Sequence, residues 1–134
     1  GTDCSEDYVH GTTVTLTATP ATGSSFAGWS GACSGAGTCT VSMTAARTVT
    51  ATFNAANYGL TVSRSGSGSG MVTSNPTGVT CGTDCTESYA YGTTVSLTAT
   101  PAAGASFTGW SGACTGTGNC VVGMTSSRTV TAHF

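Results

Sequence analysis

An internal duplication constrains the fold of this chain more than any other feature. Residues 1–53 align without a gap onto residues 82–134, and roughly 37 of the 53 aligned positions are identical. Between the copies lie a short linker, residues 54–56, and a segment that the first copy lacks, residues 57–81. Because a repeated sequence folds into a repeated unit, we expect two small tandem repeats: residues 1–53, without the opening segment, and residues 57–134, with it.

Each copy contains two runs in which apolar and polar side chains alternate. Residues 13–20 place apolar side chains on one face and threonines on the other, which is the pattern of a half-buried strand. Residues 94–101 repeat this run, and residues 47–53 and 128–134 alternate in the same way. No window of the sequence shows convincing helical periodicity. We therefore predict an all-β, mainly antiparallel fold with almost no helix.

The segment between the copies is predicted to be a β-hairpin that opens the second repeat. Residues 58–63 and residues 71–74 alternate like strands, and a flexible run of glycine and serine separates them at residues 65–70. The first copy has no counterpart of this segment. If the mature chain starts at residue 1, the first copy is predicted to leave a sheet edge unpaired; the alternative is that truncation removed the segment.

Charged residues are scarce, and this excludes some classes of partner. The 134 residues include three arginines and no lysine, and the net charge is −2. Binding to a phosphate backbone requires several cationic side chains, so nucleic acid is not an expected partner. No apolar run is long enough to insert into a membrane, and no signal peptide is recognisable, so we expect a mature product or a piece of a longer secreted protein.

Seven cysteines in a chain with so little charge indicate a disulfide framework made in an oxidising compartment, so an extracellular or cell-surface location is expected. Two pairs enclose glycine-rich loops that let strand ends approach to bonding distance: Cys33 with Cys39, and Cys114 with Cys120. Cys81 and Cys85 flank Gly-Thr-Asp and could close a third loop, which leaves Cys4 unpaired or available for an intermolecular bond. In a different frame Cys4 pairs with Cys81, and Cys85 is the odd thiol.

Four motifs follow one another in the second copy. They are Val-Thr-Cys-Gly-Thr-Asp-Cys, Tyr-Gly-Thr-Thr-Val-Ser-Leu-Thr-Ala-Thr-Pro, Phe-Thr-Gly-Trp-Ser-Gly-Ala-Cys and Arg-Thr-Val-Thr-Ala-His-Phe. In this order they resemble the divergent internalin B-repeat, also called the bacterial repeat domain, over nearly the whole chain. The resemblance implies a small β-rich fold, β-grasp-like or a small sandwich, in a secreted or cell-surface bacterial protein. It transfers no catalytic residues.

The sequence Gly-Trp-Ser-Gly-Ala, which occurs in both copies, superficially suggests a serine nucleophile. A nucleophile elbow needs a glycine two positions after the serine, whereas here glycine follows Ser30 and Ser111 directly. Neither His10 nor His133 has a histidine at the aligned position of the other copy, so the copies cannot share a histidine base or a paired-histidine metal site. We therefore predict no catalytic residues, no enzyme activity and no cofactor.

Two carboxylates recur near the first cysteine of each copy: Asp3 and Glu6, and Asp84 and Glu87. Calcium takes about six to eight oxygen ligands, and two carboxylates with loop carbonyls could supply part of such a shell. The simpler interpretation is that these carboxylates are solvated in a polar loop. They are kept only as calcium candidates, and no metal site is predicted.

Each copy places a tryptophan three residues after a phenylalanine and just before a disulfide loop. Trp29 and Trp110 could either stack on a sugar or close the core over the disulfide, and packing is the favoured interpretation. Because residues three apart point to opposite faces of a strand, one aromatic ring of each pair is expected to be exposed. Tyr89 and Tyr91 would enlarge such a patch.

The predicted function is a non-catalytic structural or adhesive repeat module, with protein or glycan at the bacterial surface as its partner. One alternative is a carbohydrate-binding accessory module of a secreted hydrolase, which would contact sugar through its tryptophans and tyrosines. Another is a self-assembling filament subunit, in which the unpaired edge of residues 1–53 accepts a strand from another chain and Cys4 bonds across the interface.

Overall fold

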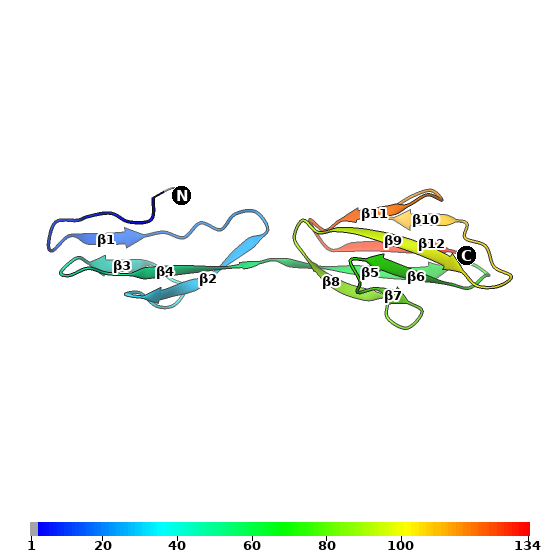
Figure 1. The fold of residues 1–134 in the computed structure, drawn as a ribbon, viewed down its shortest axis with the longest axis horizontal. Helices are drawn as coiled ribbons and strands as arrows, with labels where there is room; N and C mark the ends of the chain where they lie inside the picture. Colours follow the sequence, from blue (N-terminus) through cyan, green and yellow to red (C-terminus); the bar gives the residue numbers. More distant parts are fainter. Residues whose placement is uncertain (1–2) are drawn as a thin grey trace. The chain divides into compact units, whose positions relative to one another are not determined.

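The computed structural model describes residues 3–134, which form twelve β-strands and no helix (Figure 1). The prediction of an all-β, mainly antiparallel fold is confirmed. The chain divides into two compact units, which we call unit 1, Gly1–Ala55, and unit 2, Ala56–Phe134. No helix in this part of the chain is long and apolar enough to cross a membrane.

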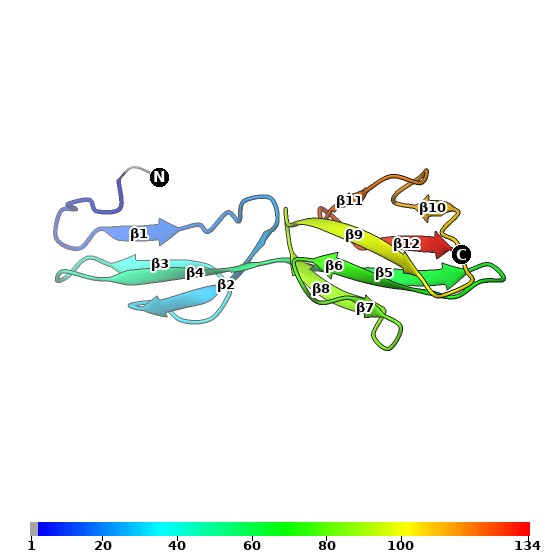
Figure 2. The same cartoon turned by 45° about the vertical axis from the view of Figure 1, so that its right-hand side comes forward.

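Unit 2 is a sandwich of two four-stranded sheets (Figure 2). One sheet has the strand order β10-β12-β5-β8 and the other has the order β11-β9-β6-β7. The strands are β5 (Asn57–Ser65), β6 (Gly70–Asn75), β7 (Thr80–Cys81), β8 (Thr86–Ala90), β9 (Thr94–Pro101), β10 (Gly109–Gly112), β11 (Cys120–Gly123) and β12 (Arg128–His133). Neighbouring strands are antiparallel except β12 and β5, which pair in parallel from Arg128 opposite Leu60 to His133 opposite Ser65.

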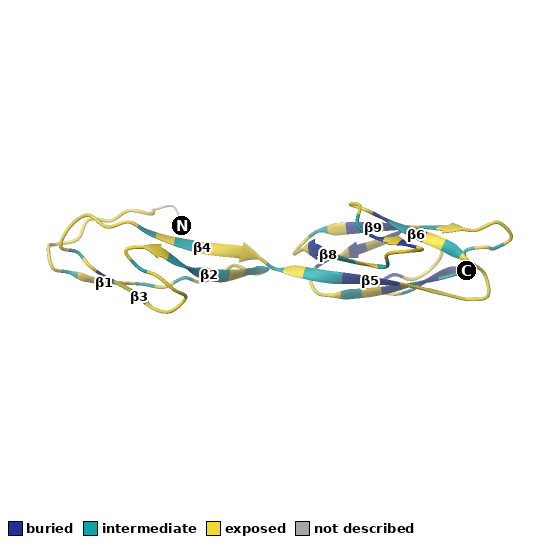
Figure 3. Cartoon of the chain, turned by 90° about the horizontal axis from the view of Figure 1, so that it is seen from below, coloured by how far each residue is buried: buried dark blue, intermediate teal, exposed yellow. Residues whose placement is uncertain are grey.

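The core of unit 2 lies between the two sheets. The alternating strands turn their apolar side chains inward, so that Leu60 and Val130 from one sheet and Val72 and Val95 from the other are completely buried. Most polar side chains of the same strands face outward, as the period-2 pattern requires, and Ser74 of β6 is a buried exception. Figure 3 shows the buried positions running along the strands of unit 2.

Residues 57–81 do not form the predicted hairpin, because their two long strands do not pair with each other. β5 lies between β12 and β8 in one sheet, whereas β6 lies between β9 and β7 in the other. Packed sheets are about 10 Å apart, and the glycine-serine loop is long enough to cross that distance. The crossing lets both strands bury their apolar faces in the shared core. We call residues 57–81 the arch.

Within residues 3–55, unit 1 contains only two two-stranded sheets. β1 (Thr13–Leu16) pairs with β3 (Cys39–Ser42), and β2 (Ser24–Gly31) pairs with β4 (Val49–Ala55). These four strands correspond in sequence to β9, β11, β10 and β12 of unit 2. Asn54 and Ala55, which were predicted as linker, belong to β4, so that only Ala56 lies between β4 and β5.

Candidate functional site

The same apolar residues are exposed to different degrees in the two units. The open face of unit 1 consists of five side chains: Val14, Leu16, Val41, Met43 and Val49. Their counterparts in unit 2 are almost fully buried, whereas in unit 1 only Val41 is buried and the other four are partly exposed. Phe53 differs in the same sense, since 44% of its surface is exposed compared with 6% for Phe134.

The arch accounts for this difference. In unit 2 it adds β5 to the edge of β12 and β6 to the edge of β9, and it lays its apolar side chains over the core. The matching edges of β4 and β1 in unit 1 carry no strand within residues 3–134. A groove of about 650 Å³ lies along the open face, bordered by Asp3, Cys4 and Glu6.

Residues 3–10 and 84–91 have similar sequences but different structures. In unit 2, Thr86–Ala90 forms β8 against β5, and Tyr89 is 7% exposed. The Tyr89 hydroxyl shares a hydrogen bond of 2.9 Å with Ser74 Oγ and lies 3.2 Å from the Pro76 carbonyl oxygen. Tyr8, its counterpart, lies outside any strand and is 45% exposed. The partner of this segment is therefore the arch.

The structure contains three disulfides, which join the cysteines that the sequence pairs within short loops: Cys33–Cys39, Cys81–Cys85 and Cys114–Cys120. The alternative frame that pairs Cys4 with Cys81 is therefore not adopted. Cys4 is an exposed free thiol. It corresponds in sequence to Cys85, whose bonding partner, Cys81, belongs to the arch.

The prediction that each Phe-Trp pair splits across a strand is wrong. Phe26 and Trp29 make an edge-on contact with 5.1 Å between ring centroids. A β-bulge between Phe26 and Gly28 inserts one residue, which returns Trp29 to the same face as Phe26. Phe107 and Trp110 of unit 2 make the same edge-on contact, with 4.9 Å between ring centroids. Beside them the Gly116 backbone comes so close that a Cβ on Gly109 would lie 3.2 Å from the Gly116 carbonyl oxygen.

The four rings predicted as candidates for carbohydrate contact do not all reach the surface. Trp110 is 5% exposed and its Nε1 donates to the Gly118 carbonyl at 2.9 Å, and Tyr89 is buried as described above. Neither ring offers a face to a sugar. Trp29 is partly exposed, with its Nε1 bonded to the Gly37 carbonyl, and Tyr91 is exposed beside Tyr58.

Three of the four carboxylates considered for calcium accept hydrogen bonds from local backbone amides. Asp3 Oδ1 accepts from the Ser5 N–H at 3.1 Å, and Asp84 Oδ1 accepts from the Thr86 N–H at 3.2 Å. Glu87 accepts from the next residue in the chain, and Glu6 is exposed. Over residues 3–134 no three His, Cys, Asp or Glu side chains gather into a group that could hold a metal ion.

One contact that sequence reasoning missed joins Ser111 and His133. Ser111 Oγ and His133 Nε2 share a hydrogen bond of 2.7 Å across β10 and β12. The register of these strands places Gly109 opposite His133, and Ser111 lies two residues further along β10. Once this strand pairing is assumed, a diagonal contact between Ser111 and His133 can be predicted. An activated serine also needs a group that orients the histidine and donors for an oxyanion, and the hydrogen bonds of His133 include no carboxylate.

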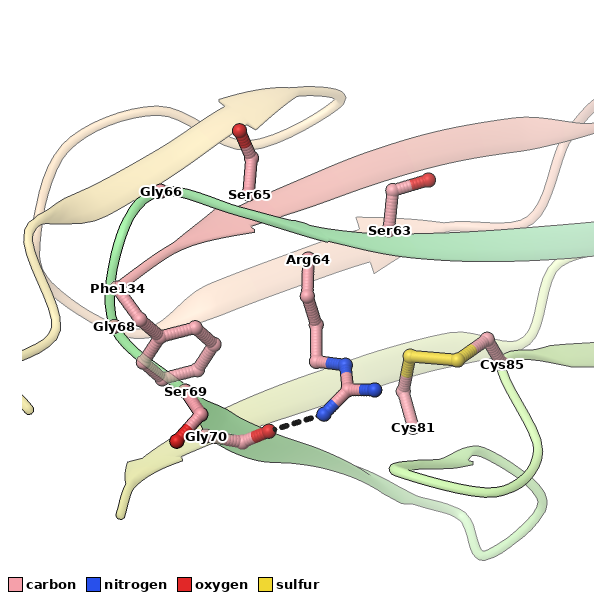
Figure 4. Close-up of a pocket in the computed structure, with 10 residues that line it drawn as sticks. All are labelled: Ser63, Arg64, Ser65, Gly66, Gly68, Ser69, Gly70, Cys81, Cys85 and Phe134. Carbon is pink, nitrogen blue, oxygen red and sulfur yellow. Dashed lines mark hydrogen bonds between the residues drawn. A yellow bond between two sulfur atoms is a disulfide. The ribbon is translucent and has the colours of Figure 1, made fainter. Parts of the chain in front are cut away.

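A cavity of about 490 Å³ lies at the turn of the arch (Figure 4). Arg64 extends into it and donates from Nη1 to the Gly70 carbonyl at 2.7 Å, with the Cys81–Cys85 disulfide on one side and the Phe134 ring on the other. The lining contains one cation and no carboxylate, thiol or histidine. It therefore holds no acid-base or nucleophilic pair.

The structural duplication agrees with the comparisons with known proteins. No curated protein and no solved structure matches the chain significantly. The family model of the divergent InlB B-repeat domain matches twice in succession, at residues 1–57 and at residues 58–134. The two matches cover the chain, and the chain therefore belongs to the divergent InlB B-repeat domain family.

Proposed function

We propose that this chain is a non-catalytic structural module that carries tensile load in a secreted or cell-surface bacterial protein. The observation that carries the proposal is the parallel pairing of β5 with β12. These are the first and last strands of unit 2, and they pair side by side over six residues.

Parallel pairing of the first and last strands sets how a pulling force acts on unit 2. The chain enters β5 at Asn57 and leaves β12 after His133, at the other end of the shared ladder (Figure 1). Tension between these points slides the two strands past each other and loads all ladder hydrogen bonds together. The Phe134 N–H adds a bond of 2.8 Å to the Ser65 carbonyl at the end of this ladder. This geometry supports the proposed load-bearing role.

Two further observations support a structural role outside the cytoplasm. Three disulfides staple the chain, and structural disulfides persist in oxidising compartments. In unit 2 the aromatic and hydroxyl groups that could act on a ligand, such as Trp110, Tyr89 and Ser74, are bonded within the core. Adhesion to protein or glycan at the bacterial surface is the finer form of the proposal.

Single-molecule pulling of the full chain tests the load-bearing role. One experiment attaches the handles at the two ends of the chain, and the matched experiment attaches them at Ser69, in the turn of the arch, and at the C-terminus. The second geometry peels the strands apart one hydrogen bond at a time, because the Gly68 N–H bonds the Phe134 carbonyl beside that turn. We expect unit 2 to unfold at a clearly higher force in the first geometry. Equal forces would refute the proposal.

A glycan panel with tryptophan fluorescence tests the adhesive form of the proposal. Trp29 is the more exposed of the two tryptophans, so a bound sugar is expected to change the emission of the Trp110→Phe variant. If no glycan changes it, the ligand of the module is not a sugar that stacks on Trp29.

Hydrolysis of any ester or peptide substrate that disappears in the Ser111→Ala variant would contradict the non-catalytic assignment.

A further inference from the structure

The open face of unit 1 matches, residue for residue, a surface that is already occupied in unit 2. We infer that this face binds an arch segment of the type of residues 57–81 that reaches it from outside residues 3–134. One strand of the bound arch pairs with β4 and the other pairs with β1. This inference does not depend on the load-bearing role.

The lengths of β1 and β9 show where a strand is missing. Residues 17–20 and 98–101 have the same sequence, Thr-Ala-Thr-Pro, but only residues 98–101 are in a strand. β9 continues to Pro101 because β6 pairs with residues 96–101, whereas β11 reaches only residues 94–97. β1 ends at Leu16, which lies opposite Cys39, the first residue of its one described partner, β3. The second strand of an arch would extend β1 in the antiparallel sense.

The edge of β4 is the second strand edge on which a bound arch would pair. Its counterpart β12 pairs in parallel with β5, which in turn pairs with β8. Strand addition of this kind gains affinity from main-chain hydrogen bonds and specificity from alternate side chains. In unit 2 these side chains are Leu60 and Val62, which are buried in the core. On unit 1 they would cover Val49 and its neighbours.

Residues 3–10 would become the outer strand of the completed sheet. Their counterparts in β8 pair with β5 from Asn57 opposite Ala90 to Thr61 opposite Thr86. Tyr8 would then take the position of Tyr89, whose hydroxyl contacts Ser74 and Pro76 of the arch. The 45% exposure of Tyr8 should fall on binding.

A disulfide bond formed by Cys4 would report that an arch has bound. In unit 2 the equivalent Cys85 is bonded to Cys81, at the end of the arch. A bound arch would therefore bring its own Cys81 to the exposed thiol of Cys4. When the bound arch is a peptide whose Cys81 carries glutathione in a mixed disulfide, the Cys4 thiolate attacks the Cys81 sulfur. The Cys4–Cys81 bond forms, the Cys81–glutathione bond breaks, and glutathione leaves as a thiolate.

A second copy of this chain is not the expected donor. Its arch is already held in its own unit 2, with Leu60 and Val72 fully buried. Removal of that arch would open the same two strand edges there, so that one site would be filled by emptying another. The occupant is therefore an arch that its own repeat does not hold.

The test uses the full chain and a synthetic peptide of residues 57–81 that carries glutathione on Cys81. A control peptide has the substitutions Leu60→Ser, Val62→Ser and Val72→Ser, which leave the thiol chemistry unchanged. We expect a Cys4–Cys81 adduct by mass spectrometry, formed at least about tenfold faster than with the control peptide, because docking raises the effective concentration of the two sulfurs. Equal rates, or glutathione transfer to Cys4 without a peptide adduct, would overturn the inference.

A second arm removes the covalent step. The Cys4→Ser chain and a Cys81→Ser peptide are followed by amide hydrogen exchange. Binding should slow exchange in β1, in β4 and over residues 5–9, and the triple-serine peptide should not. Unchanged exchange overturns the inference, as does a dimer of the chain that persists in excess peptide, because that dimer would show that a second copy covers the face.

Discussion

Gly112 illustrates how closely individual residues are fitted to the sandwich. It ends β10 with φ at +92°, and a Cβ at this position would lie 2.5 Å from the Thr129 carbonyl oxygen and 3.4 Å from the Val130 Cα. Both neighbours are backbone atoms of β12, so they cannot rotate away. The left-handed φ and the steric overlap therefore both penalise any side chain at this residue.

We predict that Gly112→Ala lowers the free energy of unfolding of unit 2 by at least about 2 kcal/mol. Gly118→Ala is the matched control. Gly118 lies in the neighbouring disulfide loop, and a Cβ there meets nothing within 4 Å, so this change should stay within about 0.5 kcal/mol. Urea titration followed by the fluorescence of Trp110 measures both. Similar stabilities of the two variants would contradict the prediction.

The buried hydroxyl of Ser74 allows a second prediction about a single residue. This hydroxyl accepts from the Val79 N–H at 2.9 Å, donates to the Pro76 carbonyl at 2.8 Å and contacts the Tyr89 hydroxyl. Ser74→Ala leaves the Val79 N–H without its partner inside the core, so we expect a loss of about 1–3 kcal/mol. Ser69→Ala, at an exposed position of the turn, should change little. Equal effects of the two substitutions in a urea titration would be evidence against a structural role of the Ser74 hydroxyl.

At the scale of elements, alternation predicted which residues form strands but not which strands become neighbours. Residues 58–63 and 71–74 were correctly assigned to strands, yet they were expected to pair with each other and instead entered different sheets. A period-2 pattern fixes which face is buried and leaves open whether the partner lies beside the strand or across the core. In unit 2 that choice is made by two strand edges, since β12 pairs with β5 and β9 pairs with β6.

The candidate site shows the same limit of sequence reasoning. The missing segment of the first copy and the odd Cys4 were visible in the alignment of the two copies, and together they locate the open face. The position of Trp29 was not visible, because a one-residue bulge reverses the face on which its side chain lies. The bulge has no clear signature in a sequence that already contains glycine at many positions.

Corresponding strands of similar sequence in the two units should differ in their local stability. The amides of β9 and β12 are shielded by a neighbour on each side, whereas β1 and β4 each have one neighbour within the described chain. We predict faster hydrogen exchange in β1 and β4 than at the aligned positions of β9 and β12. Comparison of aligned residues cancels the effect of sequence on intrinsic exchange at the identical positions. Equal protection would mean that unit 1 is stable without an arch.

At the scale of the whole molecule, two repeats of similar sequence differ in how completely they bury their apolar residues. Unit 2 has one core that includes both sheets, from Leu60 to Phe134. In unit 1 only Cys39 and Val41 are fully buried among residues 3–55. A pair of two-stranded sheets without a covered face is marginally stable at best, so the Cys33–Cys39 disulfide has to supply more of the stability of unit 1.

The two units should therefore unfold separately, and the chain carries one tryptophan in each to report it. In the Trp110→Phe variant Trp29 reports on unit 1, and in the Trp29→Phe variant Trp110 reports on unit 2. Each substitution alters the unit that is not being observed. We expect the unit 1 midpoint at a lower urea concentration than the unit 2 midpoint, because a smaller apolar area is buried in unit 1. Added arch peptide should raise the unit 1 midpoint alone, since a ligand that binds only the folded state stabilises it. Coincident midpoints would show instead that the two repeats unfold as one cooperative structure.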